Sequence, residues 1–306
     1  MLNRVVEICQ ENRYLSLNRG FLVIKEGDVE LGSVPLDDIA VLVLSAQSIT
    51  ITKNILNALS EKGCVTVLCG KNYIPQSMVI PEFSHYLFSK ILKTQIQASQ
   101  PLKKRIWQQV VMSKIRHQAH CLKINGKDVE SKKLYLISKS VNSGDTNNRE
   151  SYAAKLYWKA LFGSEFIRNK DGDGINALLN YGYAIMRAAM TRAICASGLL
   201  PTLGIHHDNI SNQFCLSDDL FEVYRPLVDC MVCKIVQEGN QELTPEVKKT
   251  LAKTLQVMVH TTEGSSPAVT SMQYLSSSYV KSLETKTLVI TLPDWEGNEN
   301  GITIIE

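Results

Sequence analysis

Histidines and carboxylates of the kinds that bind metal ions gather in one short stretch of the chain. His206 and His207 stand on the connection that follows Gly198, a residue typical of helix ends. Asp219 and Glu222 are three residues apart and are therefore neighbours on the surface of the helix predicted next. A loop imidazole that faces carboxylates on a following helix can form a mixed nitrogen and oxygen site, which suits Mn²⁺ or Mg²⁺ better than zinc.

The same side chains also have structural explanations. Asp218 or Asp219 can cap the start of the helix, with Glu222 near the position of a capping box. Glu222 can pair with Arg225, and the two histidines can simply hydrogen-bond their own loop. Spacing alone therefore leaves both the metal site and these structural roles open.

Glu150 is the other candidate, at the point where a polar loop, 142–148, becomes a predicted helix. The helix dipole favours a carboxylate in the first turn, which is a sufficient reason for a Glu at this position. A catalytic role for Glu150 therefore needs support from outside its own segment.

The elements that must position these side chains fall into a β-rich part and a helical part. Strands are predicted at 4–9, 14–18, 21–25, 29–35, 39–45 and 64–68, with a helix at 52–62 and a loop at 73–83. The run at 39–45 is continuously apolar, as expected of a strand covered on both faces. From about Phe88 the periodicity is helical, and further helices are predicted at 128–140, 149–162, 174–198, 217–238 and 244–259.

These patterns predict an α+β protein with an N-terminal β-rich domain followed by a larger all-helical domain. The predicted boundaries are a β-rich domain at 1–80, a linker at 81–98, a helical domain at 99–286 and a C-terminal tail at 287–306. The tail is predicted to open with a β-like run at 287–292 and to continue as a polar, acidic segment.

Composition indicates a soluble globular protein, with 44% hydrophobic and 21% charged residues. Neither an apolar run of membrane-spanning length nor a signal peptide is recognisable, so we expect a cytoplasmic protein. The eight cysteines are scattered, and the single CxxC, Cys230 and Cys233, lacks the further ligands of a zinc site. A structural role is therefore favoured for both thiols.

Charge is unevenly distributed along the chain. Residues 99–170 hold fifteen Lys and Arg against five Asp and Glu, whereas residues 171–306 hold nine against sixteen. A basic middle beside an acidic C-terminal part suits a polyanion bound next to a carboxylate-rich metal site. The same basic residues are equally compatible with solvated helix faces.

Four motifs in order resemble the CRISPR-associated integrase family Cas1, over roughly residues 1–285. The likeness extends to the β-rich run from Val5 to Gly70, and the segment Lys114-Ile-x-x-Gln118-Ala119 is most similar to members from type II systems. The motifs are Glu150-Ser-x-Ala-Ala-Lys-x-Tyr, Asn176-Ala-Leu-Leu-Asn180-Tyr-Gly-Tyr183, Gly198-Leu-x-Pro-x-Leu-Gly-x-x-His207 and Leu216-x-x-Asp-Leu-x-Glu222-x-x-Arg225-Pro.

The resemblance implies a β domain that mediates dimerisation, a helical catalytic domain, and an Mg²⁺ or Mn²⁺ site held by Glu150, His207 and Glu222. His207 is preferred to His206 because it stands three residues after Gly204, as in the family motif. The second carboxylate is Asp in many relatives and Glu here, so Asp219 is retained both as the alternative ligand and as a candidate for supporting the ligands.

The implied reaction is the attack of a captured DNA fragment's 3′-hydroxyl on a phosphodiester at the edge of a CRISPR repeat, in antiviral defence. Arg149 and Lys155 are candidate DNA contacts, as is the basic segment 99–133, while Asn180 is a candidate for orienting the site. The implied partners are DNA, a second copy of the chain and the small companion protein Cas2. In type II systems, the effector nuclease and a DNA-end-binding ring protein are further candidates.

Two other functions use the same sequence features. A metal-dependent nuclease acting on branched or single-stranded DNA needs the same ligands, because cleavage and integration are related phosphoryl transfers. A DNA-binding scaffold of the same complex needs only the basic surface. The presence of every expected ligand type favours an enzyme.

Overall fold

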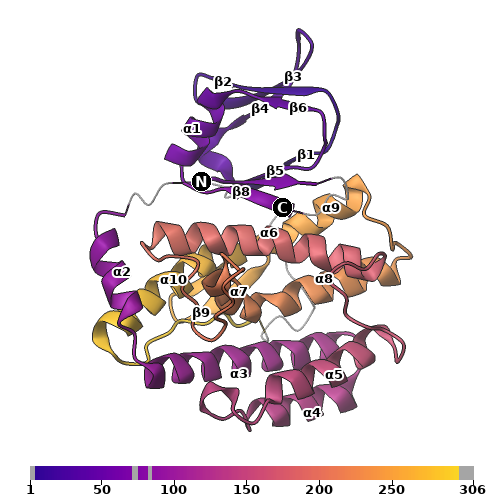
Figure 1. Ribbon diagram of the computed structural model, residues 1–306. Coiled ribbons are helices and arrows are strands. Elements are labelled where there is room, and N and C mark those ends of the chain that lie inside the picture. Colours follow the sequence, from indigo (N-terminus) through magenta and orange to yellow (C-terminus); the bar gives the residue numbers. More distant parts are fainter. Residues whose placement is uncertain (1–3, 71–74, 82–84, 296–306) are drawn as a thin grey trace.

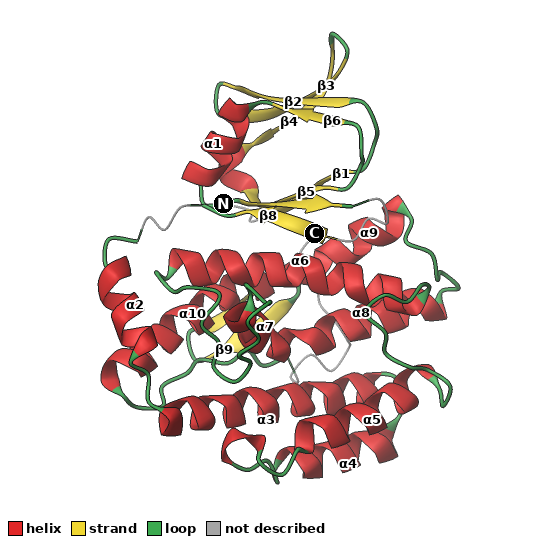
Figure 2. Ribbon diagram, in the orientation of Figure 1, coloured by secondary structure: helices red, strands yellow, loops and turns green. Residues whose placement is uncertain are grey.

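The computed structural model describes residues 4–70, 75–81 and 85–295. A β-rich N-terminal part stands on a larger helical part (Figure 1), and Figure 2 shows most of the strands in the first part and most of the helices in the second. The predicted α+β class and the order of its two parts are therefore confirmed. In the portion of the chain that is described, no helix has the length and apolar character needed to cross a membrane.

Two four-stranded sheets make up the β-rich part. The first sheet is parallel except for its last strand, and the second is an antiparallel meander with one parallel strand added at its edge. In spatial order the first contains β1 (Arg4–Ile8), β5 (Ile39–Leu44), β7 (Val65–Cys69) and β8 (Pro75–Val79), and the second contains β4 (Val29–Pro35), β3 (Phe21–Glu26), β2 (Arg13–Asn18) and β6 (Ile49–Ile51).

Strand β5 is buried on both faces, as its continuous apolar sequence predicts. Leu42 and Leu44 point into the core between the two sheets, which helix α1 (Lys53–Glu61) completes. Val41 and Val43 point the other way and belong to the core of the helical part. The alternation of side chains along one strand therefore joins the two parts through a shared sheet.

The helical part contains nine α-helices among the described residues, with short 3₁₀ turns between some of them. Its two longest helices connect its layers: α6 packs against β5 and β7, and α3 packs against α4, α5 and α8. The helices are α2 (Phe88–Ile96), α3 (Gln100–Ile124), α4 (Asp128–Ser138), α5 (Arg149–Phe162), α6 (Ile175–Ala196), α7 (Cys215–Phe221), α8 (Arg225–Gln237), α9 (Pro245–Ala252) and α10 (Ala268–Thr285). The 3₁₀ turns found in the described residues are η1 (Leu36–Asp38), η2 (Ser143–Asp145), η3 (Glu222–Tyr224) and η4 (Lys253–Gln256).

A buried polar joint reinforces the contact between the two parts. The Glu7 carboxylate on β1 accepts hydrogen bonds from Ser45 Oγ at 2.5 Å and from Tyr181 OH on α6 at 2.6 Å. The Lys248 ammonium on α9 lies 3.3 Å from the same carboxylate and is almost fully buried. Because a buried charge is stable only when it is paired and hydrogen-bonded, this cluster favours one orientation of the sheet on the helices.

Two predictions in the β-rich part need correction. The predicted loop 73–83 contains β8, whose proline stands at the first position of the strand, where a missing N–H is tolerated. The short strand β6 was not predicted, because three residues give no usable alternation. Helix α2 begins at Phe88, where helical periodicity was predicted to start, and it lies within the stretch 81–98 that was predicted to be a linker.

The C-terminal third also differs from its prediction. The helix predicted at 244–259 ends at Ala252, and the following residues form η4 and the hairpin of β9 (Met258–Thr261) and β10 (Gly264–Pro267), so the helical part is not purely helical. Helix α10 was not predicted. The run 287–292 forms no strand. It belongs to an irregular segment that packs on the helices and continues to Trp295, which is fully buried. The rest of the predicted tail lies outside the described residues.

Candidate active site

Helix α3 carries the residue around which the candidate site is built. The Lys114 ammonium lies 2.5 Å from Glu150 Oε1 and 2.6 Å from Glu222 Oε2. The Lys114 and Glu222 side chains are only 12% and 8% exposed, and that of Glu150 is 24% exposed. Two of the three predicted ligands therefore converge from different helices onto one cation.

Glu150 is positioned by a cap at the start of α5. Asp145 accepts hydrogen bonds from the backbone N–H groups of Arg149 at 2.8 Å and Glu150 at 3.1 Å. The residue that directly precedes the helix, Asn148, has a left-handed backbone and makes no side-chain cap of its own. Asp145 therefore satisfies the first free N–H groups of the helix and holds its first turn against α3.

Glu222 lies at a break in the helix predicted at 217–238. Pro226 has no N–H, so it cannot donate to the Glu222 carbonyl as an α-helix requires, and the chain instead passes through the 3₁₀ turn η3. On the other side of the carboxylate, Arg225 Nε lies 2.9 Å from Glu222 Oε1. The predicted Glu222–Arg225 pair is thus confirmed, and it leaves Oε2 facing Lys114.

The loop between α6 and α7 is folded around the carboxylate of Asp219, which is completely buried. Its Oδ2 accepts the backbone N–H groups of Ile205 at 2.6 Å and His206 at 2.9 Å, with that of His207 at 3.4 Å. Its Oδ1 lies 2.5 Å from His207 Nδ1. Gly204 is needed here because a Cβ atom would lie 2.2 Å from the His207 carbonyl oxygen.

The two histidines have different environments. The His206 ring stacks on Trp107 of α3, with ring centroids 4.6 Å apart and planes within 3° of parallel. The His207 ring stands edge-on to the same tryptophan at 5.5 Å. Because Asp219 takes Nδ1 of His207, the opposite nitrogen, Nε2, is the one available to a ligand.

The charges of the site stabilise one another. Burial alone would raise the pKa of Glu222, but Arg225 and Lys114 outweigh it and hold that pKa below its ordinary value. Burial opposes the charged form of Lys114, yet Glu222 and Glu150 raise its pKa. The hydrogen bond to Asp219 raises the pKa of His207. The pairing therefore favours the charged forms of both Lys114 and Glu222.

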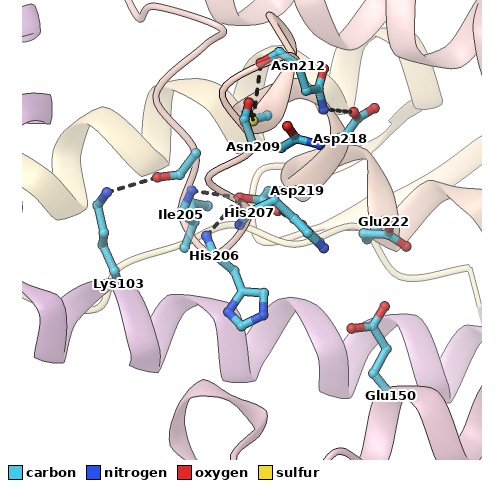
Figure 3. A network of polar contacts seen from close by, with 12 residues as sticks. Lys103, Glu150, Ile205, His206, His207, Asn209, Asn212, Asp218, Asp219 and Glu222 are labelled. Carbon is cyan, nitrogen blue, oxygen red and sulfur yellow. Dashed lines mark hydrogen bonds and ion pairs between the residues drawn. The ribbon is translucent and has the colours of Figure 1, made fainter.

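The donor set fits a divalent ion that prefers oxygen and one imidazole nitrogen. In Figure 3 the His207 ring and the carboxylates of Glu150 and Glu222 face a common space. Glu222 Oε2 is buried and accepts no well-aligned hydrogen bond from the described residues, despite its ion pair with Lys114. No three His, Cys, Asp or Glu side chains in the described ranges are close enough to hold an ion, since Lys114 lies between the carboxylates.

The remaining candidates from the sequence lie around this centre. Arg149 is half-buried and Lys155 is exposed, both on α5 with Glu150. Asn180 accepts a hydrogen bond from Arg168 at 2.6 Å and donates one to the Lys170 carbonyl, so it orders the loop before α6 and makes no contact with the three predicted ligands. His206 and Asp219 support the His207 loop as described above.

Sequence reasoning missed several side chains that shape the site. Lys114 was noticed only as part of a motif, without a role. Trp107 and Asp145 were not singled out, because their partners His206 and Glu150 come from other elements. The one available signal was a lysine among the mostly buried residues of α3, close to Val111 and Ile115.

A buried acid connects α8 to α5 and α6 behind the site. Asp229 accepts hydrogen bonds from Tyr157 OH at 3.0 Å and from Tyr183 OH. The Tyr183 ring in turn lies 4.8 Å from the Arg225 guanidinium, which holds Glu222. Burial raises the pKa of Asp229 to about 7.

As the pH rises, the free energy of unfolding of the Asp229→Asn variant should increase relative to that of wild type. An unfolded Asp loses its proton near pH ~4, whereas folded Asp229 keeps its proton up to about pH 7. Between these values the native state binds more protons, so the wild-type free energy of unfolding falls as pH increases, by up to ~3–4 kcal/mol. Urea denaturation of both proteins at about pH 5 and about pH 8 measures the difference. Asp171→Asn, at an exposed position, is the control. The prediction is contradicted if the free energies of unfolding of Asp229→Asn and wild type differ by the same amount at both pH values.

Comparison with known proteins gives a consistent result for most of the chain. The sequence model of a protein family, described as CRISPR associated protein Cas1, matches residues 6–259. A protein of Neisseria meningitidis serogroup C (strain 8013), described as CRISPR-associated endonuclease Cas1, is 41% identical over 254 residues. Those residues are 82% of this chain and 83% of the relative.

Two solved structures share the fold. A structure described as a casposase bound to integration product superposes with a TM-score of 0.79 at 18% identity, covering 99% of this chain and 96% of that one. A chain of a Cas6-RT-Cas1–Cas2 complex gives a TM-score of 0.76 at 17% identity, covering 97% of this chain and 36% of that one. At these identities the similarity establishes the fold alone.

Proposed function

The chain belongs to the CRISPR-associated Cas1 family, and on that basis we propose that it is a metal-dependent DNA integrase that inserts captured DNA fragments into a CRISPR array. The 3′-hydroxyl of a fragment attacks a phosphodiester at the edge of a repeat, and a second attack on the other strand completes insertion. The observation that supports the proposal is that Glu150 and Glu222 meet at Lys114 from separate segments, with the His207 ring facing the same space (Figure 3).

In this proposal Glu150 and Glu222 supply carboxylate oxygens and His207 supplies Nε2 to Mg²⁺ or Mn²⁺. The bound ion would polarise the phosphodiester and stabilise the displaced oxygen. Arg225 holds Oε1 of Glu222 at 2.9 Å, which leaves Oε2 for the ion. Asp219 occupies Nδ1 of His207, which leaves Nε2 as the nitrogen that faces the reaction centre.

DNA is the proposed substrate, and the basic stretch 99–170 is its proposed binding surface. Lys104, Arg105, Lys132 and Lys133 are exposed there, and Lys155 lies one helical turn beyond Glu150 on α5. Lys103 has a different role, since its ammonium donates to the Gly204 carbonyl at 2.9 Å and so ties the His207 loop to α3. The casposase bound to integration product, which shares this fold, supports a DNA-joining role.

The proposed assembly is a homodimer, formed through the β-rich domain 1–80, that works with the companion protein Cas2. The complex of a structurally similar chain with Cas2 supports that partner. Two further statements stay predictions from the sequence: that the protein associates with a type II effector nuclease and a DNA-end-binding ring protein, and that it is cytoplasmic.

A joining assay with purified components tests the proposed reaction. The full chain, with and without Cas2, is incubated with a DNA fragment that carries a free 3′-hydroxyl and a plasmid that carries a repeat. We expect joined product with Mn²⁺ or Mg²⁺ and none with a chelator. A folded, DNA-binding protein that joins no DNA with any divalent ion would show the integrase proposal to be wrong.

A metal-dependent nuclease is the second candidate, favoured by the word endonuclease in the name of the Neisseria relative. The same ligands serve both reactions, because water can replace the 3′-hydroxyl as nucleophile. The two candidates differ in cells that carry a repeat array. New spacers that depend on this chain support the integrase, whereas cleavage of branched DNA without any spacer gain supports the nuclease. A scaffold without chemistry gives neither result.

A further inference from the structure

Lys114 lies at the centre of the candidate site, although the proposed reaction gives it no part. Its ammonium contacts one oxygen from each carboxylate, Glu150 Oε1 at 2.5 Å and Glu222 Oε2 at 2.6 Å. The side chain is 12% exposed, and it is the charge that joins α3 to both α5 and η3. The two carboxylates would otherwise face each other without a cation between them.

The two cations at Glu222 are held in different ways. The Arg225 guanidinium takes Oε1 and lies over the rings of Tyr183 at 4.8 Å and Phe221 at 4.4 Å, so it is fixed by packing as well as by charge. Lys114 takes Oε2 at 2.6 Å from the end of a flexible four-carbon stem. Of the two, Lys114 is the cation that can leave the carboxylate.

We propose that Lys114 is a built-in counter-ion that occupies the divalent-ion position while the ion is absent and must withdraw for the ion to bind. The inference rests on the proposed function, because it assumes an ion at Glu150, His207 and Glu222. An ion bound to these carboxylates uses the oxygens that face the space between them, and those are the oxygens that Lys114 holds. A dication and an ammonium repel each other at such distances, so only one of them occupies the position.

Two consequences follow from this competition. The ion-free site keeps its shape, because the ammonium neutralises carboxylates that would otherwise repel each other. The affinity for the ion is lowered, because each binding event must first displace Lys114 from two ion pairs. Removal of the Lys114 charge therefore has opposite effects on the stability of the ion-free protein and on ion affinity.

The test compares Mn²⁺ binding by the full-length protein and its Lys114→Met and Lys114→Gln variants, using isothermal titration calorimetry at constant ionic strength. We expect each variant to bind Mn²⁺ about tenfold or more tightly than wild type. We also expect a lower ion-free melting temperature and a larger increase of that temperature with Mn²⁺. Lys123→Met is the matched control, since it removes the same charge from an exposed position of α3 and should leave the Mn²⁺ affinity unchanged.

The Glu222→Gln protein separates failure of this inference from failure of the proposed function. If Mn²⁺ binding depends on Glu222 but the Lys114 variants bind equally or more weakly, Lys114 positions the ligands and the inference is overturned. If Mn²⁺ binding is independent of Glu222 in wild type and in both variants, the ion lies elsewhere. In that case both the proposed site and the inference are wrong. Because Gln retains a hydrogen-bond donor, Lys114→Gln keeps the test decisive if Lys114→Met does not fold.

Discussion

Glu222→Gln should reduce divalent-ion-dependent DNA joining by at least roughly a hundredfold to a thousandfold. The substitution preserves shape, and the amide oxygen can still accept from Arg225, which holds Oε1 in the wild type. The amide nitrogen then replaces Oε2, the buried oxygen that faces Lys114 and the proposed ion. An N–H₂ group cannot ligate a cation, so the site loses a ligand while its packing is kept.

The loss must be separated from unfolding, because Glu222 is 8% exposed and neutralises two cations. Circular dichroism and thermal unfolding check that the variant is folded, and initial rates of joining are then compared at saturating DNA and Mn²⁺. Glu242→Gln, an exposed position away from the site, is the control and should retain wild-type rates. A folded Glu222→Gln protein with a rate within about tenfold of wild type would remove Glu222 from the proposed ligand set.

Asp219→Asn should lower both the joining rate and the Mn²⁺ affinity by roughly ten- to a hundredfold, although Asp219 is not a proposed ligand. Both of its oxygens are taken by protein groups: Oδ2 by the backbone of the His207 loop and Oδ1 by His207 Nδ1. With one oxygen replaced by N–H₂, one of these contacts must fail. If the amide donates to Nδ1, the proton of His207 moves to Nε2 and blocks ion binding.

If the amide nitrogen instead faces the loop, it opposes the backbone N–H groups of Ile205 and His206, and the loop is destabilised. Either arrangement weakens the site, and calorimetric titration with Mn²⁺ together with joining rates measures the effect. Asp218→Asn is the matched control, because the Asp218 carboxylate is adjacent in sequence but faces Arg187 and Asn212 instead of His207. Asp219→Asn and Asp218→Asn proteins that behave alike would show that Asp219 does not orient His207.

Much of the fold was predictable because it depends on local patterns. The apolar run of β5, the helical stripes of α5 and α6 and the stop at Gly198, with φ of +74°, correspond to structure within a few residues. Predictions failed where an element was short or its pattern weak, as in β6 and β8. They also failed at the C-terminal end of α9, where tertiary contacts convert a helical pattern into a hairpin.

The sequence by itself determined the types of side chain in the candidate site and the order in which they occur along the chain. It could not decide between Asp219 and Glu222, because residues three apart share one face of a regular helix. The structure separates them: Asp219 precedes the 3₁₀ turn and points into the His207 loop, whereas Glu222 opens that turn and points toward α3.

Only the tertiary structure placed Lys114 between Glu150 and Glu222. The ammonium and its two partners belong to α3, α5 and η3, which come together through packing of their apolar faces. No periodicity within one helix specifies which polar side chain of another helix it will meet, because that depends on how the buried faces pack. The residues that could hold an ion were therefore visible in the sequence, and the cation that competes with it was not.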